Sequence, residues 1–165
     1  MKKSVKISLL LACSLVVPLA YAETTIPMYL VAPQGHGKEI GTISATDSPY
    51  GLVLTPHLTG LTPGLHGFHV HQNSSCEDNG MAAGGHLDPE KTGKHLGPYN
   101  AGHLGDMPAL YVDKEGNATL PILAPRLKEV DLKNHALMIH AGGDNYSDHP
   151  PLGGGGARIA CGTAK

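Results

Sequence analysis

Glycine and proline recur so often along this chain that they limit what it can fold into. The 165 residues include 22 glycines, 13 prolines and no tryptophan, and both frequent residue types interrupt long helices. Between them lie short segments rich in Val, Ile, Leu, Thr and Tyr, which is typical of strands separated by turns. These segments cover residues 26–31, 39–46, 51–56, 109–112, 118–123 and 136–140. The sequence therefore predicts an all-β domain, with one short helical turn within residues 126–134.

The first 22 residues have the pattern of a secretory leader. A basic start is formed by three lysines, Lys2, Lys3 and Lys6. An apolar run over residues 7–17 and the small-X-small site Ala20-Tyr21-Ala22 follow. We expect cleavage after Ala22, export to the periplasm and a single mature domain over residues 23–165. The run is shorter than the roughly 20 residues that a membrane span needs, and no other stretch approaches that length.

A second interpretation of the leader makes it a lipoprotein signal. In that case Leu10-Leu11-Ala12-Cys13 is the cleavage box and Cys13 carries the lipid. The apolar run continues past Cys13, and a conventional cleavage site follows it. Both features favour the cleaved secretory leader.

His69 and His71 are the first of several candidate metal ligands. Residues two apart on a strand project from the same face, whereas Val70 between them points the other way. Two imidazoles can thus converge on one ion. Taken alone, such a pair also fits solvated or hydrogen-bonded histidines.

Further ligand candidates follow in a loop-like region. His86 comes after two glycines, and His95, His103 and Asp106 lie in a Gly- and Pro-rich stretch without helical or strand periodicity. A polar surface loop is the alternative for that stretch. With His140 the chain offers seven groups, whereas two four-coordinate centres need eight, so one group is shared or one position is open. Imidazoles without thiolate suit Cu(II), and a tetrahedral set of His and Asp suits zinc.

Six segments of this chain resemble the copper/zinc superoxide dismutases, specifically their bacterial periplasmic branch. The segments are Leu65-His66-Gly67-Phe68-His69-Val70-His71, Ala83-Gly84-Gly85-His86-Leu87-Asp88-Pro89, Gly93-Lys94-His95-Leu96-Gly97-Pro98, Gly102-His103-Leu104-Gly105-Asp106, Met138-Ile139-His140 and Gly153-Gly154-Gly155-Gly156-Ala157-Arg158-Ile159-Ala160-Cys161-Gly162. The resemblance covers essentially all of the chain after the leader. It implies an eight-stranded Greek-key β-barrel or sandwich with long metal-binding loops.

The resemblance also implies a division of the ligands between one copper and one zinc per chain. Copper would be held by His69, His71, His86 and His140. Zinc would be held by His86, His95, His103 and Asp106. His86 is then shared, and its ring takes up a proton when its bond to reduced copper breaks.

Two more residues gain a role from the same resemblance. Asp144 looks like the carboxylate that accepts hydrogen bonds from the outer ring nitrogens of His69 and His95. Arg158 looks like the arginine that guides superoxide, because its guanidinium offers a permanent charge and several donors to a small anion. Without the resemblance, Asp144 would be read as a turn residue and Arg158 as a surface charge.

The cysteine count supports a disulfide. Removing the leader leaves only Cys76 and Cys161, in an oxidising compartment, so we expect them to pair. In the chain-entropy model such a closure stabilises the fold by roughly 4 to 5 kcal/mol. The bond would tie the loop after His71 to the strand after Arg158 and so fix the rim of the site.

The charge balance of the mature chain contrasts with an anionic substrate. Without the three leader lysines, 9 Lys and Arg stand against 14 Asp and Glu, a formal charge of −5. Attraction of superoxide would then depend on a local cluster of positive charge, for which Arg158, the copper and Lys91 or Lys94 are candidates. No basic run indicates nucleic acid, and no amphipathic stretch indicates a membrane surface.

The function that follows is an exported superoxide dismutase, which converts superoxide to dioxygen and hydrogen peroxide on a redox-cycling copper beside a structural zinc. The alternative is a copper- and zinc-binding or delivery protein without turnover. A homodimer is compatible with the sequence, as is a monomer. Five histidines lie outside the ligand pattern: His66, expected to be scaffold, and His36, His57, His135 and His149, expected at the surface.

Overall fold

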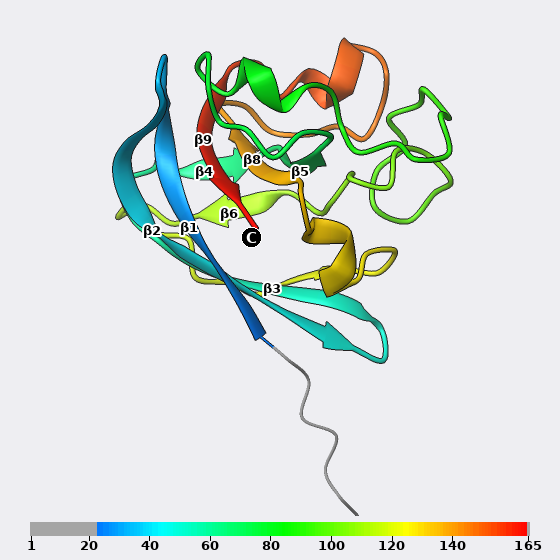
Figure 1. Cartoon of the computed structure of the whole chain (residues 1–165), viewed down its shortest axis with the longest axis horizontal. Helices are drawn as coiled ribbons and strands as arrows, with labels where there is room; N and C mark the ends of the chain where they lie inside the picture. Colours follow the sequence, from blue (N-terminus) through cyan, green and yellow to red (C-terminus); the bar gives the residue numbers. More distant parts are fainter. Residues whose placement is uncertain (1–22, 165) are drawn as a thin grey trace, which may run out of the picture.

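The structure, a computed structural model, describes residues 23–164, and nearly all of its regular secondary structure is β-strand (Figure 1). The predicted leader with Cys13, and Lys165, lie outside the described residues. The strands are β1 (Glu23–Ala32), β2 (Gly35–Ser48), β3 (Gly51–Leu58), β4 (Gly64–His66), β5 (Phe68–His71), β6 (Leu110–Val112), β7 (Ile122–Ala124), β8 (Ala136–His140) and β9 (Arg158–Thr163). The three short 3-10 helices are η1 (Met81–Ala83), η2 (Glu129–Leu132) and η3 (Pro151–Gly154). Residues 23–164 contain no α-helix, as the glycine and proline content predicted.

Seven strands form one curled antiparallel sheet, which bends into a half-barrel (Figure 1). Their order is β5-β8-β9-β1-β2-β3-β7, and β4 and β6 form a separate pair. Long connections allow β5 to pair with β8, and β1 with β9, so that partners in the sheet are distant in sequence. This is the Greek-key arrangement expected for the chain. Residues 23–164 contain nine strands rather than eight because Gly67 separates β4 from β5, its N–H donating to the carbonyl of Gly142.

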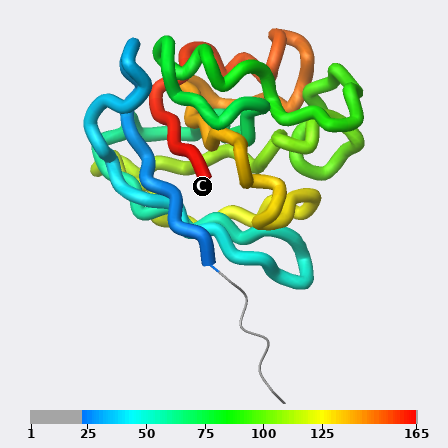
Figure 2. The backbone as a smooth tube through the Cα atoms, in the orientation of Figure 1, coloured from blue at the N-terminus to red at the C-terminus, as the bar shows by residue number. Residues whose placement is uncertain are grey.

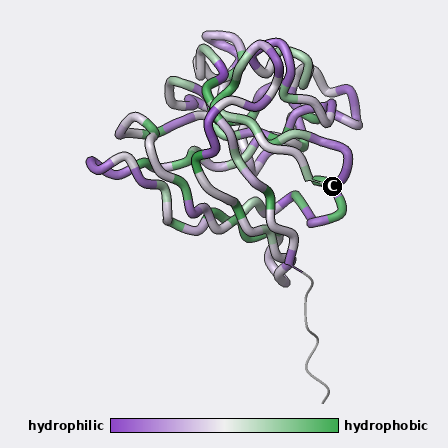
Figure 3. The backbone as a smooth tube through the Cα atoms, turned by 60° about the vertical axis from the view of Figure 1, so that its left-hand side comes forward, coloured by the Kyte–Doolittle hydropathy of each residue, from purple (hydrophilic) through white to green (hydrophobic). Residues whose placement is uncertain are grey.

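Alternating burial along the strands builds the core inside the half-barrel. In β3 the side chains of Leu52, Leu54, Pro56 and Leu58 are buried, whereas the residues that alternate with them are partly or fully exposed. Full burial of such a side chain stabilises the fold by about 1.5 to 3 kcal/mol. Figure 3 shows the complementary pattern, in which hydrophilic segments gather in the outer loops.

Strand β5 differs from β3 because it is buried on both faces. Phe68 and Val70 belong to the hydrophobic core, and His69 and His71 on the opposite face are buried as well. Their cover comes from the two longest loops, residues 72–109 and 141–157, which gather on one side of the molecule (Figure 2). A histidine pair on a strand is therefore enclosed by the protein and not solvated.

The predicted segments agree with the observed strands except at one place. Residues 136–140 coincide with β8, and the predicted helical turn contains the 3-10 helix η2. The prediction for residues 118–123 is wrong in its bounds, because β7 begins only at Ile122 and Ala118 makes an isolated bridge to Leu58. Pro121, which has no N–H for a ladder, lies between the two pairings.

Candidate metal centre

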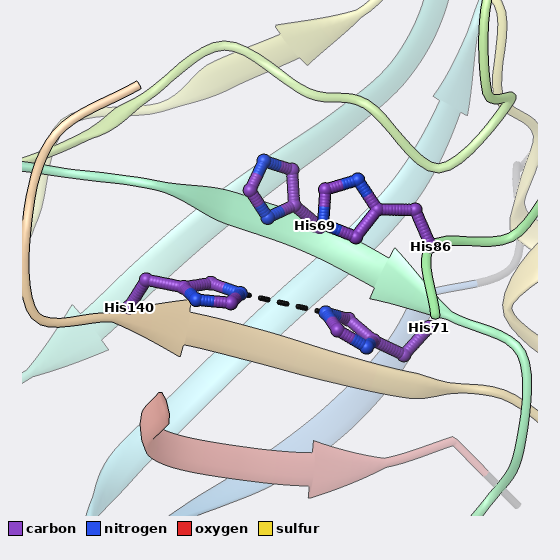
Figure 4. A group of neighbouring side chains, drawn as sticks. All are labelled: His69, His71, His86 and His140. Atoms are coloured by element: carbon purple, nitrogen blue, oxygen red, sulfur yellow. Dashed lines mark hydrogen bonds between the residues drawn. The ribbon is translucent and has the colours of Figure 1, made fainter. Parts of the chain in front are cut away.

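Two paired strands supply three of the histidines. His69 and His71 lie on β5, and His140 is the last residue of the neighbouring strand β8. The N–H of His140 donates to the carbonyl of Gly67, 2.9 Å away, which fixes the end of β8 beside the start of β5. Figure 4 shows the three rings on the same side of these strands, with His86 facing them.

The loop that carries His86 follows β5 like an additional strand. His71 and His86 form an isolated antiparallel bridge, and the N–H of Leu87 donates to the carbonyl of Val70, 2.8 Å away. The ring of His86 stacks on that of His69, with 3.9 Å between their centroids. Backbone pairing thus places His86, a loop residue, against the two histidines of β5 that the sequence analysis predicted to be metal ligands.

Gly105 brings the last part of the same loop to β5. Its carbonyl accepts from the N–H of Val70 at 2.9 Å, and its own N–H donates to Leu87. A Cβ at this position would lie 2.2 Å from the carbonyl oxygen of Val70. Only glycine permits this approach, which delivers His103 and Asp106 to the site.

The candidate ligands form two adjoining clusters. In the first, the ring nitrogens of His69, His71, His86 and His140 lie within 4.8 Å of one another, and the Nε2 atoms of His71 and His140 are 3.4 Å apart (Figure 4). The second cluster brings together ligand atoms of His69, His86, His95 and Asp106 within the same distance.

The second cluster differs from the predicted zinc set in one member. His69 takes the place of His103 because its ring stacks on His86 at the junction of the two clusters. His103 nevertheless lies close, with its Nδ1 atom 3.4 Å from Oδ1 of Asp106.

Backbone carbonyls orient two of the histidines. Nδ1 of His71 donates to the carbonyl of Gly84 at 2.9 Å, and Nδ1 of His140 donates to the carbonyl of Gly156 at 3.2 Å. A hydrogen bond at one ring nitrogen leaves the other as the ligating atom. In both rings that atom is Nε2, which faces the first cluster.

Asp144 orients two more of the histidines, His69 and His95. Its Oδ2 accepts from Nε2 of His69 and its Oδ1 from Nε2 of His95, each at 2.7 Å. The carboxylate is buried behind both clusters. It connects them because it accepts hydrogen bonds from the outer ring nitrogens of one histidine in each. These are the hydrogen bonds that the resemblance implied for Asp144.

Gly153 makes the position of Asp144 possible. A Cβ on Gly153 would lie 2.0 Å from Oδ1 of Asp144 and 2.7 Å from Nε2 of His95, and the residue has a φ of 72°. The glycine run before Arg158 is therefore packed against the site and is not simply a flexible connection.

Four inward-facing nitrogens have no hydrogen-bond partner in residues 23–164. They are Nδ1 of His69, Nε2 of His86, Nδ1 of His95 and Nδ1 of His103. A buried polar atom without a partner is costly, so several at one place indicate a group that binds there. Imidazole nitrogens beside one carboxylate suit borderline transition metals such as copper and zinc.

Burial keeps the four histidines of the first cluster neutral, which is the form that binds a metal. Loss of solvation lowers the pKa of His69 to about 3, of His71 to about 2 and of His140 to about 4. Burial also lowers the pKa of His86. These rings are unprotonated ligands at neutral pH.

The two carboxylates stay ionised. Burial opposes their charge, but the hydrogen bond from His86 and the nearby ring of His95 hold the pKa of Asp106 below its usual range. Hydrogen bonds from His69 and His95 do the same for Asp144. One negative group therefore lies in the second cluster, and another lies behind both.

Arg158 lies at the entrance to the first cluster. It begins β9, where it pairs with His140, and its half-buried guanidinium donates to the carbonyls of Gly80 and Gly84. A cavity of about 280 Å³ is lined by both His140 and Arg158, and also by Met81 of η1. Lys91 and Lys94 are not among the residues that line it. Of the cationic candidates, Arg158 has the position to meet a small anion.

The disulfide between Cys76 and Cys161 is present, as predicted, and spans 85 residues. Cys161 belongs to β9, and the carbonyl of Cys76 accepts from the N–H of Gly80. The bond thus attaches the loop that holds the guanidinium of Arg158 to the strand on which Arg158 lies.

Three contributing residues escaped the sequence analysis or received little from it. His66, expected to be scaffold, is buried between the carbonyls of His140 and Thr62, each 2.7 Å from a ring nitrogen. Asp148 accepts from the N–H of His95 at 3.0 Å. Arg126 donates to the loop around His103 and was read only as the start of a helical turn.

The remaining histidines lie away from the clusters. His36, His57 and His149 are exposed, as expected. His135 is half-buried, and its ring lies 2.7 Å from the carbonyl of Gln72. No helix within residues 23–164 has the length and apolar character to cross a membrane.

Comparison with known proteins gives consistent matches. A family model described as copper/zinc superoxide dismutase (SODC) matches residues 39–164, which include every residue of both clusters. Superoxide dismutase [Cu-Zn] 1 of Salmonella typhimurium is 58% identical over 165 aligned residues, covering 93% of this chain and 92% of the relative.

Solved structures agree with the sequence matches. The Cu/Zn superoxide dismutase from Brucella abortus has a TM-score of 0.83 and 48% identity, covering 87% of this chain and 100% of that chain. The monomeric copper, zinc superoxide dismutase from Salmonella enterica has a TM-score of 0.78 and 54% identity, with the same coverage.

Proposed function

This chain belongs to the copper/zinc superoxide dismutase family, and from that premise we propose which of its residues bind copper, which bind zinc and which act on the substrate. It is an oxidoreductase that converts superoxide to dioxygen and hydrogen peroxide, with copper and zinc as cofactors. The division depends on one observation. His69 and His86 both belong to the two clusters, but Nε2 of His69 is engaged by Asp144, whereas both ring nitrogens of His86 face ligand sets.

The copper ligands are His69, His71, His86 and His140. Each offers one nitrogen to the first cluster, and three of them are oriented by an outer hydrogen bond to Asp144, Gly84 or Gly156. All four groups are imidazoles, which suit Cu(II).

The zinc ligands are His86, His95, His103 and Asp106. Oδ1 of Asp106 lies 2.9 Å from Nδ1 of His86, 3.0 Å from Nδ1 of His95 and 3.4 Å from Nδ1 of His103. His103 is preferred to His69 because its buried Nδ1 has no hydrogen-bond partner in the described part of the chain, whereas His69 has one free nitrogen, which the copper set uses. A closed set of three nitrogens and one oxygen suits a structural zinc.

Three side chains would act on the reaction itself. Copper supplies the one-electron oxidation and reduction when it is bound. Arg158 binds and orients the superoxide anion at the cavity shared with His140. His86 would hold a proton on Nε2 when Nδ1 is bound to zinc and Nε2 is not a ligand. In the structure Nδ1 donates to Asp106, 2.9 Å away, which aligns the ring.

Reconstitution tests the assignment as a whole. Residues 23–165, loaded with one copper and one zinc, should remove superoxide far faster than the same concentration of free copper. The alternative, a binding or delivery protein, predicts tight uptake of both metals and a rate no better than that of free copper.

Replacing Arg158 with Glu should lower the rate of superoxide removal by roughly 10-fold or more, because a focused positive field becomes negative at the cavity. Added salt should then raise the rate of the variant, whereas it lowers that of the unmodified chain. The matched control is Lys114→Glu, which makes the same charge change at a distant exposed residue. Equal rates for the two variants, at equal metal content, would remove Arg158 from the mechanism.

Replacing Asp106 with Ala should release zinc before copper, because it removes the only anionic ligand from the second cluster. We expect a loss of zinc affinity greater than the roughly 10- to 100-fold that follows loss of a ligand's hydrogen-bond partner. Competition with a chelator measures each metal, and His71→Ala should show the opposite order. Simultaneous loss of both metals from Asp106→Ala would mean that the ligands are divided wrongly.

We further propose that the chain is exported to the periplasm, cleaved after Ala22 and folded as one domain over residues 23–165. The leader pattern supports this, as does a disulfide that needs an oxidising compartment. The mass of the chain from a periplasmic fraction tests the cleavage site, and a lipid on Cys13 would give a larger, membrane-bound product. Homodimer formation stays a prediction, which the elution volume of the mature chain tests.

A further inference from the structure

Arg126 is a half-buried cation that, within residues 23–164, donates only to backbone carbonyls of the loop bearing the zinc ligands. It follows β7 and Pro125, outside the loop itself. Its Nε lies 3.1 Å from the carbonyl oxygen of Pro98, Nη1 lies 3.1 Å from that of Gly102, and Nη2 contacts those of Gly97 and His103. Arg126 takes part in no ion pair within residues 23–164.

The four carbonyls belong to two arms of the loop. Residues 97–98 directly follow His95 and Leu96, and residues 102–103 include His103 itself. The arms cross where the N–H of His103 donates to the carbonyl of Lys94, 2.9 Å away. A planar guanidinium has enough donors, in a fixed fork, to hold both arms at once. Arg126 thereby sets the separation between the backbones that carry His95 and His103.

Gly97 connects Arg126 with a third ligand through the two peptide groups on either side of its Cα. Its N–H donates to Oδ2 of Asp106 at 3.3 Å, beside the N–H of Leu96 at 3.2 Å, while its carbonyl accepts from Arg126. Oδ1 of the same carboxylate faces the zinc cluster. Arg126 and the carboxylate that faces the zinc cluster thus hold Gly97 from its two sides.

We propose that Arg126 is a positioning residue for the zinc site, holding His95, His103 and Asp106 in their binding arrangement. The inference rests on the proposed assignment of zinc to these ligands. Much of the loop 72–109 has no regular secondary structure, so its ligand geometry depends on such tertiary hydrogen bonds. Without the guanidinium, binding of zinc would itself have to order both arms, which weakens the affinity.

The test compares Arg126→Ala and Arg126→Lys with Lys128→Ala in the disulfide-bonded mature chain. Lys128 is a suitable control because it is a cation in the same segment that donates to a backbone carbonyl, that of Ser48, away from the loop. We expect the zinc dissociation constant of Arg126→Ala to rise by about 10- to 100-fold, with a smaller rise for Arg126→Lys. Lys128→Ala should bind zinc like the unmodified chain.

Cobalt bound in place of zinc gives a spectrum that depends on the ligand geometry and that a general loss of stability would not change. The visible absorption of Co²⁺ reports ligand geometry, so it should broaden and weaken in Arg126→Ala but not in Lys128→Ala. Added methylguanidinium should restore it, because a cavity of about 450 Å³ borders Arg126 and offers access. Methylammonium, which lacks the fork of donors, should not. If Arg126→Ala does not fold, the cobalt spectrum and zinc affinity of Arg126→Lys decide the question.

Unchanged zinc affinity and cobalt spectra in the Arg126 variants would overturn the proposal. Equal losses in Arg126→Ala and Lys128→Ala, without rescue, would do the same. Asp106→Ala, measured in parallel, separates this failure from that of the ligand assignment. If Asp106→Ala loses zinc while the Arg126 variants keep it, only the positioning role is wrong. If Asp106→Ala keeps zinc, the assignment itself is wrong.

Discussion

Replacing both Cys76 and Cys161 with alanine is expected to lower the free energy of unfolding by about 4 to 5 kcal/mol. The bond closes a segment with a sequence separation of 85, so its loss gives the unfolded chain much more conformational freedom. For a domain of this size that corresponds to a decrease in Tm of roughly 10 to 20 °C. Denaturant titration of the metal-free chain, with and without the two substitutions, measures the change.

The same double substitution should lower activity at temperatures where the chain stays folded. The disulfide fixes the loop whose Gly80 and Gly84 carbonyls hold the guanidinium of Arg158. A released guanidinium would no longer be held at the cavity, so adding Arg158→Glu should cost less in the disulfide-free chain than in the intact one. Independent, fully additive effects on the rate would show that the disulfide acts on stability alone.

The strand pair of histidines could be predicted because it depends only on local geometry. The two-residue period places His69 and His71 on one face whatever the rest of the fold does, and both were found there. Most strand positions could be predicted for the same reason, since apolar residues that alternate between turn residues indicate a strand with one buried face. Residues 118–123 were misassigned because the apolar composition concealed a break at Pro121.

Contacts between distant loops could not be derived from composition or spacing. Asp144 reaches His95 across 49 positions of sequence, and only the resemblance to a family suggested the contact. Gly153 is needed because a Cβ there would collide with Asp144, and no sequence pattern indicates this. Arg126 went unnoticed because its partners are carbonyls, which every residue carries and no sequence pattern reveals. Such residues become visible only when the loops are folded together.

Replacing His86 with Ala is expected to weaken both metals, which no other single ligand change should do. His71→Ala should reduce copper affinity alone, and His103→Ala zinc affinity alone, because each of these rings faces one set. For His86→Ala we expect each affinity to fall by more than the roughly 10- to 100-fold seen when a ligand's hydrogen-bond partner is removed. Chelator competition, with the exposed His57→Ala as control, gives both values.

Communication between the two sites provides the sharper measurement, because it tests which ring is shared. With Cu²⁺ in the first cluster and Co²⁺ in the second, the spectra of the unmodified chain should differ from the sum of the two singly loaded forms. In His86→Ala they should become additive, since the remaining imidazoles each offer one nitrogen to one site. His69 also belongs to both clusters, but its Nε2 donates to Asp144 at 2.7 Å and only Nδ1 is free. If the spectra stay non-additive in His86→Ala and become additive in His69→Ala, then His69 is the shared group and Asp144 must release it when the metals bind.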